Sequence, residues 1–226
     1  TDIMKNLNTI ILLGLPLLLK NLSPKKRFNA SVGLAGVLGA VDLNTIRDKV
    51  YEHLESAPVT LGLAPDGTYQ ETVEVADIDE RIGLLKQIIR ESISDPAIKK
   101  RAATLVRGTD EKEIQAVFSF IKNNVRFKEE EGEIFQDSAA TLARKYGDCD
   151  DMVTLAASLF YHLGFPLKIR VVGTQGDMDF SHVYLKVGLP KRRPTKWISF
   201  DPSVDRPLGW DIESEKKIVM QKEYTI

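Results

Sequence analysis

The sequence predicts an α+β protein in which a helix that bears the single cysteine packs on an antiparallel sheet. Apolar residues at helical spacing begin at Cys149 and end before Gly164 and Pro166. Segments typical of strands follow, separated by turn-forming residues. Shorter helical patterns come earlier in the chain, and we therefore expect a helical N-terminal region before this core.

The segment between residues 44 and 147 is expected to be mainly helical. Its helical patterns begin at good N-caps or just after a proline, and their apolar residues recur at spacings of three and four. Residues 58–69 indicate a loop, because Pro65-Asp66-Gly67 is a turn signal. The expected helices are Asn44–Ser56, Asp77–Asp95, Ala97–Val106, a helix that begins after Thr109, and Thr141–Tyr146 ending at Gly147.

The last third of the chain contains the predicted sheet. Asp148 is expected to cap the cysteine-bearing helix, and Gly164 is expected to end it. Consecutive strands joined by short connections favour antiparallel pairing. The expected strands are Leu167–Val172, His182–Val187, Lys196–Asp201 and Lys217–Tyr224.

The composition excludes several classes of function. The chain has 31 basic and 32 acidic residues and a net charge of −1, so it lacks the overall basic field that favours nucleic-acid binding. One cysteine cannot form an internal disulfide or a metal site built on several thiolates, which argues against a disulfide-bonded secreted protein. The sequence shows no glycine-rich phosphate loop, and we expect no cofactor.

Residues 1–43, here called the N-terminal arm, differ from the rest of the chain. They carry five basic and two acidic residues, a net charge of +3, whereas the remainder has a net charge of −4. Two uncharged stretches of 14 residues, 6–19 and 28–41, flank the basic turn Ser23–Arg27. Each stretch is shorter than the roughly 20 residues that span a bilayer.

Three interpretations of the N-terminal arm are open. Met4-Lys5 before an apolar run resembles a signal peptide, but no small-residue cleavage site follows directly. Two apolar stretches around a basic turn would also suit a membrane surface. We favour an arm that packs on other protein subunits, because so much contiguous apolar surface needs a cover.

Cys149 is the first candidate for chemistry. A lone cysteine is more often a small buried apolar residue. Here it stands in the first turn of a predicted helix, where the helix dipole and the backbone N–H groups favour a thiolate, and Gly147 allows a sharp entry. The neighbouring Asp148, Asp150 and Asp151 oppose ionisation of the thiol, so a cationic partner would be needed.

His182 is the candidate for that partner, and Asp201 is the candidate for its support. His182 begins one predicted strand and Asp201 ends the next. In a hairpin, the start of the first strand lies opposite the end of the second, on the same side of the sheet. An aspartate beside a histidine fixes its tautomer and supports its positive charge. A helix that places Cys149 over this hairpin would assemble a nucleophile, a base and an orienting group.

Three motifs in this order resemble the transglutaminase-like branch of the papain-like fold, in particular the versions encoded by tailed bacteriophages and prophages. The motifs are Gly147-Asp148-Cys149-Asp150-Asp151, Ser181-His182-Val183-Tyr184 and Trp197-Ile198-Ser199-Phe200-Asp201-Pro202. The resemblance covers roughly residues 64–226 and departs from the family at Phe127, where tyrosine is frequent. The first 60 residues resemble no family.

The resemblance implies thiol-based acyl transfer on a protein or peptide substrate. Cys149 would attack an amide or ester carbonyl, His182 would act as base and then as acid, and Asp201 would orient it. The Cys149 backbone N–H and the side chain of Gln136 would hold the oxyanion. The implied enzyme is a cysteine peptidase, an amidase or a transglutaminase, although the family also contains inactive structural versions.

The remaining polar residues are expected to have structural roles. Asp148, Asp150 and Asp151 offer oxygens to calcium, but consecutive residues at a helix start point in different directions, and we expect no metal site. His53 and His162 fall in ordinary helical patterns. A third group, Lys191-Arg192-Arg193, is expected to be a solvated loop tip.

The expected organisation is an apolar arm and helical segment over residues 1–60, followed by a transglutaminase-like domain over residues 64–226. Within that domain, residues 77–125 form a helical part and residues 136–226 hold the Cys-His-Asp core. The alternative to an enzyme is a phage virion structural or assembly protein that uses this fold and packs its arm on other subunits. Either function places the chain in a virion or in the bacterial cytoplasm.

Overall fold

The computed structural model describes residues 59–61, 71–73, 75, 77–129, 133–177 and 179–226. The chain divides into two compact units, Thr1–Ala57 and Pro58–Ile226, and every described residue belongs to the second unit. The N-terminal arm and the expected helix Asn44–Ser56 lie outside the described residues.

The helices of the described residues follow the predicted pattern. Asp77, Thr109 and Asp148 are the N-caps that the sequence predicts, and each accepts hydrogen bonds from backbone N–H groups of the first turn. Among these residues no helix combines the length and the apolar character that a membrane crossing requires. The helices are α4 (Ile78–Ile93), α5 (Pro96–Ala103), α6 (Asp110–Asn124), α7 (Ser138–Arg144) and α8 (Cys149–Leu163).

The main sheet has four antiparallel strands in the order β8-β7-β6-β9. All four strands were expected from the sequence, and the predicted α+β class is confirmed. Three of them extend one or two residues beyond the expected ends. The strands are β6 (Leu167–Thr174), β7 (His182–Leu189), β8 (Lys196–Phe200) and β9 (Ile218–Thr225).

Two small sheets were not expected. The first contains β1 (Val59–Leu61), β2 (Glu71–Val73) and β4 (Glu133–Phe135), so the prediction of a continuous loop over residues 58–69 is wrong. The second pairs β3 (Arg126–Phe127) with β5 (Tyr146–Gly147) in parallel.

The predicted end of the helix before Cys149 is also wrong. Lys145 adopts the left-handed conformation, with φ of 59°, and ends α7 before Tyr146. Tyr146 and Gly147 then leave the helix and pair with β3 instead.

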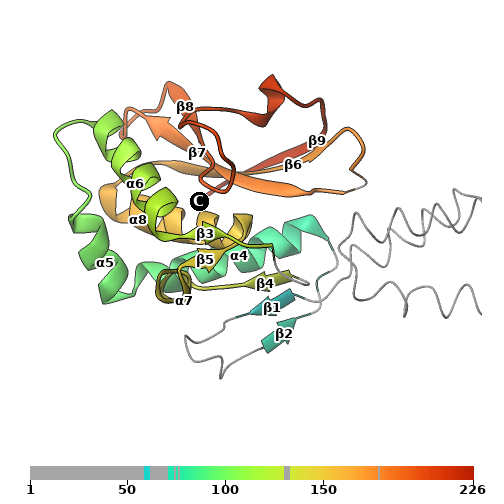
Figure 1. Ribbon diagram of the computed structural model, residues 1–226, viewed down its shortest axis with the longest axis horizontal. Coiled ribbons are helices and arrows are strands. Elements are labelled where there is room, and N and C mark those ends of the chain that lie inside the picture. Colours follow the sequence, from blue (N-terminus) through green and yellow to red (C-terminus); the bar gives the residue numbers. More distant parts are fainter. Residues whose placement is uncertain (1–58, 62–70, 74, 76, 130–132, 178) are drawn as a thin grey trace, which may run out of the picture. The chain divides into compact units, whose positions relative to one another are not determined.

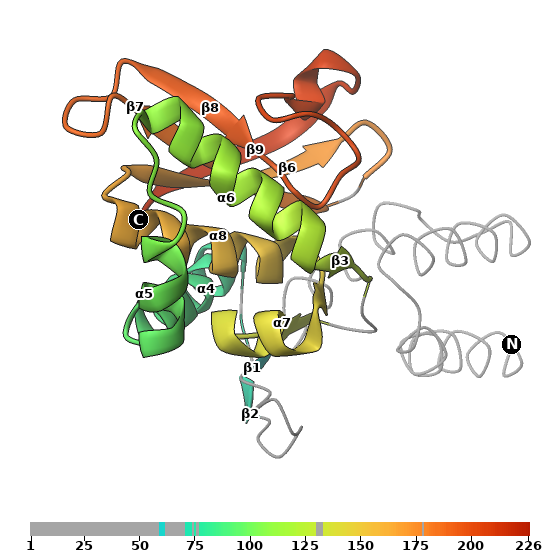
Figure 2. The ribbon, with the colours of Figure 1, turned by 60° about the vertical axis from the view of Figure 1, so that its left-hand side comes forward.

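Helix α8 lies at the centre of the second unit. Every residue from Asp150 to Phe160 is buried. The four-stranded sheet covers one side of α8, and α4, α5 and α7 cover the other, as Figures 1 and 2 show. The cysteine-bearing helix is therefore enclosed by other elements of the fold from Asp150 to Phe160, whereas Tyr161 in its last turn is exposed.

The two faces of the main sheet differ in character because side chains alternate along a strand. Val183, Leu185 and Val187 of β7 belong to the large apolar core that contains α8. The alternate residue Tyr184 belongs to a second, smaller cluster on the outer face. His182, two residues before Tyr184, shares this outer face.

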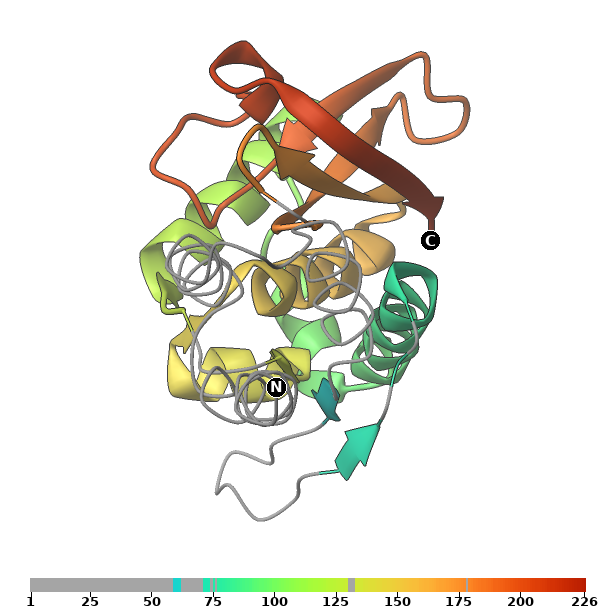
Figure 3. The ribbon, with the colours of Figure 1, turned by 90° about the vertical axis from the view of Figure 1, so that its right-hand side faces the viewer.

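Polar contacts hold the rim of the sheet to the helices. Arg192 and Arg193 are exposed, as expected for a solvated loop tip, but Lys191 differs: its Nζ lies 2.5 Å from Glu113 Oε2 and 3.4 Å from Asp110 Oδ1 of α6. At the opposite rim, Lys222 and Tyr224 of β9 contact the carboxylate of Asp79 at the start of α4, and Figure 3 shows the end of β9 beside α4.

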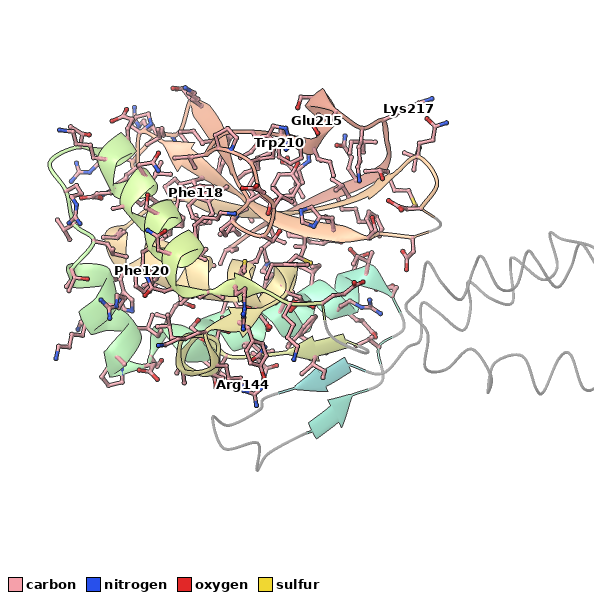
Figure 4. All side chains as sticks on the ribbon, in the orientation of Figure 1. Phe118, Phe120, Arg144, Trp210, Glu215 and Lys217 are labelled. Carbon is pink, nitrogen blue, oxygen red and sulfur yellow. The ribbon has the colours of Figure 1, made fainter. Side chains whose placement is uncertain are left out.

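Phe200→Ala should destabilise the fold by about 3–5 kcal/mol, because it removes a ring from the middle of the core. The Phe200 ring packs edge-to-face on Phe118 of α6 and Phe160 of α8, with ring centroids 5.5 and 4.8 Å away, and Figure 4 labels Phe118 on α6. Urea unfolding measures the loss. The matched control is Phe127→Ala, because Phe127 is 48% exposed and its loss should be within about 0.5 kcal/mol. Equal losses would contradict this account of the core.

Candidate active site

Cys149 is the first residue of α8 and is partly buried against the large apolar core. Asp148 fixes this helix start as its N-cap. One oxygen of Asp148 accepts hydrogen bonds from the backbone N–H groups of Asp150 at 3.2 Å and Asp151 at 3.5 Å. Burial raises the pKa of Asp148 above its ordinary value, although the hydrogen bonds that it accepts oppose this effect.

Asp151 anchors the same helix start from within the protein. Its carboxylate is fully buried and accepts the backbone N–H of Gln136 at 2.8 Å, the side-chain amide of Gln136, and the backbone N–H of Asp148 at 3.3 Å. A Cβ at Gly147 would lie 2.6 Å from the Asp151 Cβ. Glycine is therefore required at position 147 for close packing on Asp151, in addition to the sharp entry expected from the sequence.

Gln136 has partners that differ from those expected. Its side-chain N–H donates to Asp151, and its Oε1 accepts from Arg144 Nη1 at 3.3 Å. The residue is fully buried. This arrangement favours a role in holding the helix start over the direct oxyanion contact that the resemblance implies.

The carboxylates of Asp148, Asp150 and Asp151 place ligand atoms within 4.8 Å of one another. Hydrogen bonds account for two of the three groups, because Asp148 caps the helix and Asp151 binds Gln136. The carboxylates therefore lie close together because Asp148 caps the helix and Asp151 anchors the same turn to Gln136 in the protein interior.

His182 and Asp201 form the hydrogen bond that the sequence predicts. His182 Nε2 lies 2.6 Å from Asp201 Oδ2, and both side chains are mostly buried, with 16% and 5% exposed. The register differs from a directly opposed pair. Leu185 pairs with Phe200, so Asp201 comes level with Tyr184 and reaches His182 on the diagonal.

The second oxygen of Asp201 is also engaged. Asp201 Oδ1 accepts the backbone N–H of Ser203 at 3.2 Å and its hydroxyl at 2.6 Å. These bonds leave Oδ2 for the imidazole and fix the orientation of the carboxylate. Of the three expected residues, the structure joins His182 to Asp201 and places Cys149 at the start of a helix that packs on the same sheet.

Two residues near His182 were given no role from the sequence, although one of them, Tyr184, belongs to the motif that contains the histidine. Tyr184 stacks on the His182 ring, with centroids 5.8 Å apart and planes 24° apart. Asp211 accepts the Tyr184 hydroxyl at 3.0 Å. Tyr184 could have been found from the sequence, because residues two apart on a strand share a face and Tyr184 comes two residues after His182. Asp211 could not, because it lies in a long connection without a recognisable sequence pattern.

His162 is structural as expected, because its Nε2 lies 2.9 Å from the carbonyl of Ile93. His53 lies outside the described residues.

Comparison with known proteins gives one family match. Residues 99–202 match the model of the transglutaminase-like superfamily. The matched range is slightly less than half of the chain and includes Cys149, His182 and Asp201. No curated protein matches the sequence.

Several solved structures are similar to this chain at low identity, among them the following three. A proposed protease from Parabacteroides distasonis ATCC 8503 has 16% identity and a TM-score of 0.44, over 61% of this chain and 32% of that one. A proposed cysteine protease from Cytophaga hutchinsonii has 16% identity and a TM-score of 0.43, over 59% and 46% of the two chains. Legionella pneumophila LapG has 15% identity and a TM-score of 0.42, over 61% and 83%. The chain thus spans less than half the length of the first two.

Asp151→Asn should destabilise the fold by about 2–3 kcal/mol, because an amide cannot accept hydrogen bonds at both positions and leaves buried donors unpartnered. Urea unfolding measures the loss. The control is Asp148→Asn, which should stay within about 0.5 kcal/mol because asparagine caps helices about as well as aspartate. A loss in Asp148→Asn as large as that in Asp151→Asn would contradict the anchoring role of Asp151.

Proposed function

We propose, from the premise that residues 99–202 form a transglutaminase-like core, that this protein catalyses thiol-dependent acyl transfer on amide bonds. Cys149 is the nucleophile, His182 is the general base and then the general acid, and Asp201 orients His182. The activity is that of a cysteine peptidase, an amidase or a transglutaminase. The substrate is a protein or a peptide.

The observation that carries the proposal is the hydrogen bond between His182 Nε2 and Asp201 Oδ2 at 2.6 Å. In the neutral imidazole, a proton on Nε2 that is donated to a carboxylate leaves the lone pair on Nδ1. Nδ1 is then the atom that removes the proton from the thiol. The carboxylate also supports the imidazolium that forms.

The paths of α8 and β7 support an approach of Cys149 to His182. The N–H of Gly188 in β7 donates to the carbonyl of Pro166 at 2.9 Å, so the end of β7 lies beside the residues that follow α8. The 15 residues of α8 span about 22 Å, and the eight residues of β7 span about 26 Å. Because α8 and β7 pack together, have similar lengths and end side by side, we infer that they also start on the same side of the unit.

Strand alternation sets where the two groups meet. Val183 faces α8, so His182 points to the outer face of the sheet. His182 is also the first residue of β7. We therefore assign the reaction to the end of the sheet at which β7 begins, and not to the covered face, and we infer that the start of α8 adjoins this end.

The chemistry follows from these positions. The Cys149 thiolate attacks the carbonyl carbon, and we assign the oxyanion to the Cys149 backbone N–H at the helix start. His182 returns the proton to the leaving amine, which departs and leaves a thioester on Cys149. Water that attacks the thioester gives hydrolysis, and an amine that attacks it gives cross-linking.

A second candidate function rests on the N-terminal arm. We propose that the arm packs on other protein subunits, because its two uncharged stretches would otherwise expose a large apolar surface. The motifs around Cys149, His182 and Asp201 favour a phage-encoded protein, and a virion-borne enzyme would combine both functions. The bacterial cytoplasm is the other location that fits.

His182→Ala should slow the alkylation of Cys149 by iodoacetamide at neutral pH about tenfold or more, because an unassisted thiol with a pKa of about 8.5 is mostly protonated there. The chain has one cysteine, so mass spectrometry follows a single site. His162→Ala is the matched control and should react at the wild-type rate. Equal rates in wild type and His182→Ala, or labelling only after denaturation, would identify Cys149 as a buried apolar residue.

Deletion of residues 1–43 should abolish assembly of the full chain into oligomers, as measured by light scattering, and should leave the unit from residue 58 onward folded. The reason is that the apolar stretches supply the contacts between subunits. Flotation with anionic liposomes is the counter-test. Co-flotation that requires the arm and weakens with salt would indicate a membrane surface in place of subunits.

A further inference from the structure

The Tyr184 ring stacks on the His182 ring in an offset arrangement. Both residues lie on the outer face of β7, and their rings stack with centroids 5.8 Å apart. Only 1% of Tyr184 is exposed, so its ring is held by the fold and presents a fixed surface to the imidazole. Stacked aromatic pairs at this separation attract one another beyond the area that they bury.

The hydroxyl end of Tyr184 is held as firmly as its ring. The hydroxyl donates to Asp211 Oδ1 at 3.0 Å. Asp211 Oδ2 accepts from the ammonium of Lys186 and from Ser199 Oγ, the latter at 2.5 Å. Arg170 lies over the Tyr184 ring, with its guanidinium carbon 5.9 Å from the centroid. The tyrosine is thus fixed at both ends.

The protonation states suit this arrangement. Burial and the nearby charge of Asp211 raise the pKa of Tyr184, so the hydroxyl remains a donor. Burial tends to raise the pKa of Asp211, but hydrogen bonds from Lys186, Ser199 and Tyr184 outweigh it, and the pKa of Asp211 is lowered. A neutral tyrosine therefore meets an ionised carboxylate over the neutral pH range.

One connection, residues 201–217, supplies the carboxylates that bind His182 and its stacking partner. Asp201 at its start binds the ring nitrogen of His182, and Asp211 accepts the hydroxyl of Tyr184. The connection is closed on itself by Arg206, whose Nε and Nη2 donate to Glu215 at 2.9 and 2.8 Å. Trp210 Nε1 donates to the same Glu215 at 3.2 Å, and Figure 4 labels both residues on this part of the chain.

We propose that Tyr184, anchored by Asp211, is the positioning residue that fixes the plane of the His182 imidazole and so directs Nδ1 toward the Cys149 thiol. This inference rests on the proposed acyl-transfer function and deepens it. The Asp201 bond alone fixes one ring atom and leaves rotation about that bond. Contact with the Tyr184 face removes this remaining freedom.

The test compares the rate of Cys149 alkylation by iodoacetamide in the full chain of wild type, Tyr184→Leu, His182→Ala and the double variant. We expect Tyr184→Leu to slow alkylation several-fold at neutral pH, and we expect no further slowing when His182 is already alanine. Slowing of the same size in the His182→Ala background would mean that Tyr184 acts through general structure and would overturn the proposal. Wild-type reactivity in Tyr184→Leu would also overturn it.

Tyr224→Leu is the matched control. Tyr224 lies in the same sheet, and its hydroxyl also donates to an aspartate, Asp79, at 2.5 Å. We expect this variant to alkylate at the wild-type rate. Slowing equal to that in Tyr184→Leu would show a generic effect of sheet destabilisation and would overturn the proposal. If His182→Ala itself reacts like wild type, the proposed function fails, and this outcome is distinct from a failure of the Tyr184 role alone.

Tyr184→Phe, which keeps the ring and removes the anchor to Asp211, keeps the test decisive if Tyr184→Leu does not fold. The readout is the nitrogen NMR spectrum of the imidazoles, which is simple because the chain has three histidines. We expect the Nε2–H tautomer for His182 in both proteins, because Asp201 fixes it, and we expect broadened His182 ring resonances and slower alkylation in Tyr184→Phe, because the ring regains rotation. Unchanged His182 resonances together with an unchanged alkylation rate would overturn the proposal.

Discussion

The enclosure of α8 by other elements is the constraint on which the rest of the described structure depends. Residues from Asp150 to Phe160 are all buried, with α4 to α7 and β7 packed around them. Side chains in a protein interior leave few voids, so a helix held in this way cannot slide or turn without opening gaps. Its first turn, which carries Cys149, is therefore fixed relative to the sheet that carries His182.

Polar contacts add what the apolar enclosure cannot supply, which is the orientation of individual groups. Asp151 binds the start of α8 to Gln136, which precedes α7. On the outer face of the sheet, the connection that begins at Asp201 also contains Asp211, so one segment of chain binds both His182 and the neighbouring Tyr184. Buried polar groups stabilise a fold only when their hydrogen bonds are made. These contacts therefore depend on the surrounding packing, which holds each donor within reach of its acceptor.

Features that depend on neighbours in sequence could be predicted, and features that depend on distant partners could not. The caps of α8 and the four main strands follow from local residue patterns. The meeting of His182 with Asp201 follows from hairpin geometry. Its diagonal register does not, because the connection between β7 and β8 sets the register, whereas the alternation of side chains predicts only the face on which each lies. The strands β1 to β5 have two or three residues each and are too short to show a period of two. The contact between Gln136 and Asp151 joins residues 15 apart through tertiary packing, and it left no mark in the sequence.

The most direct measurement of the central claim is peptide mapping by mass spectrometry after the full chain reacts with p-nitrophenyl acetate, an activated ester. If the folded site activates its thiol for acyl transfer, the native chain at neutral pH should carry one acetyl group, on Cys149, within the time in which the urea-unfolded chain shows only a trace. Acetylation of Cys149 that is equally fast in the native and the unfolded chain, or that falls on lysines and spares Cys149, would contradict the account.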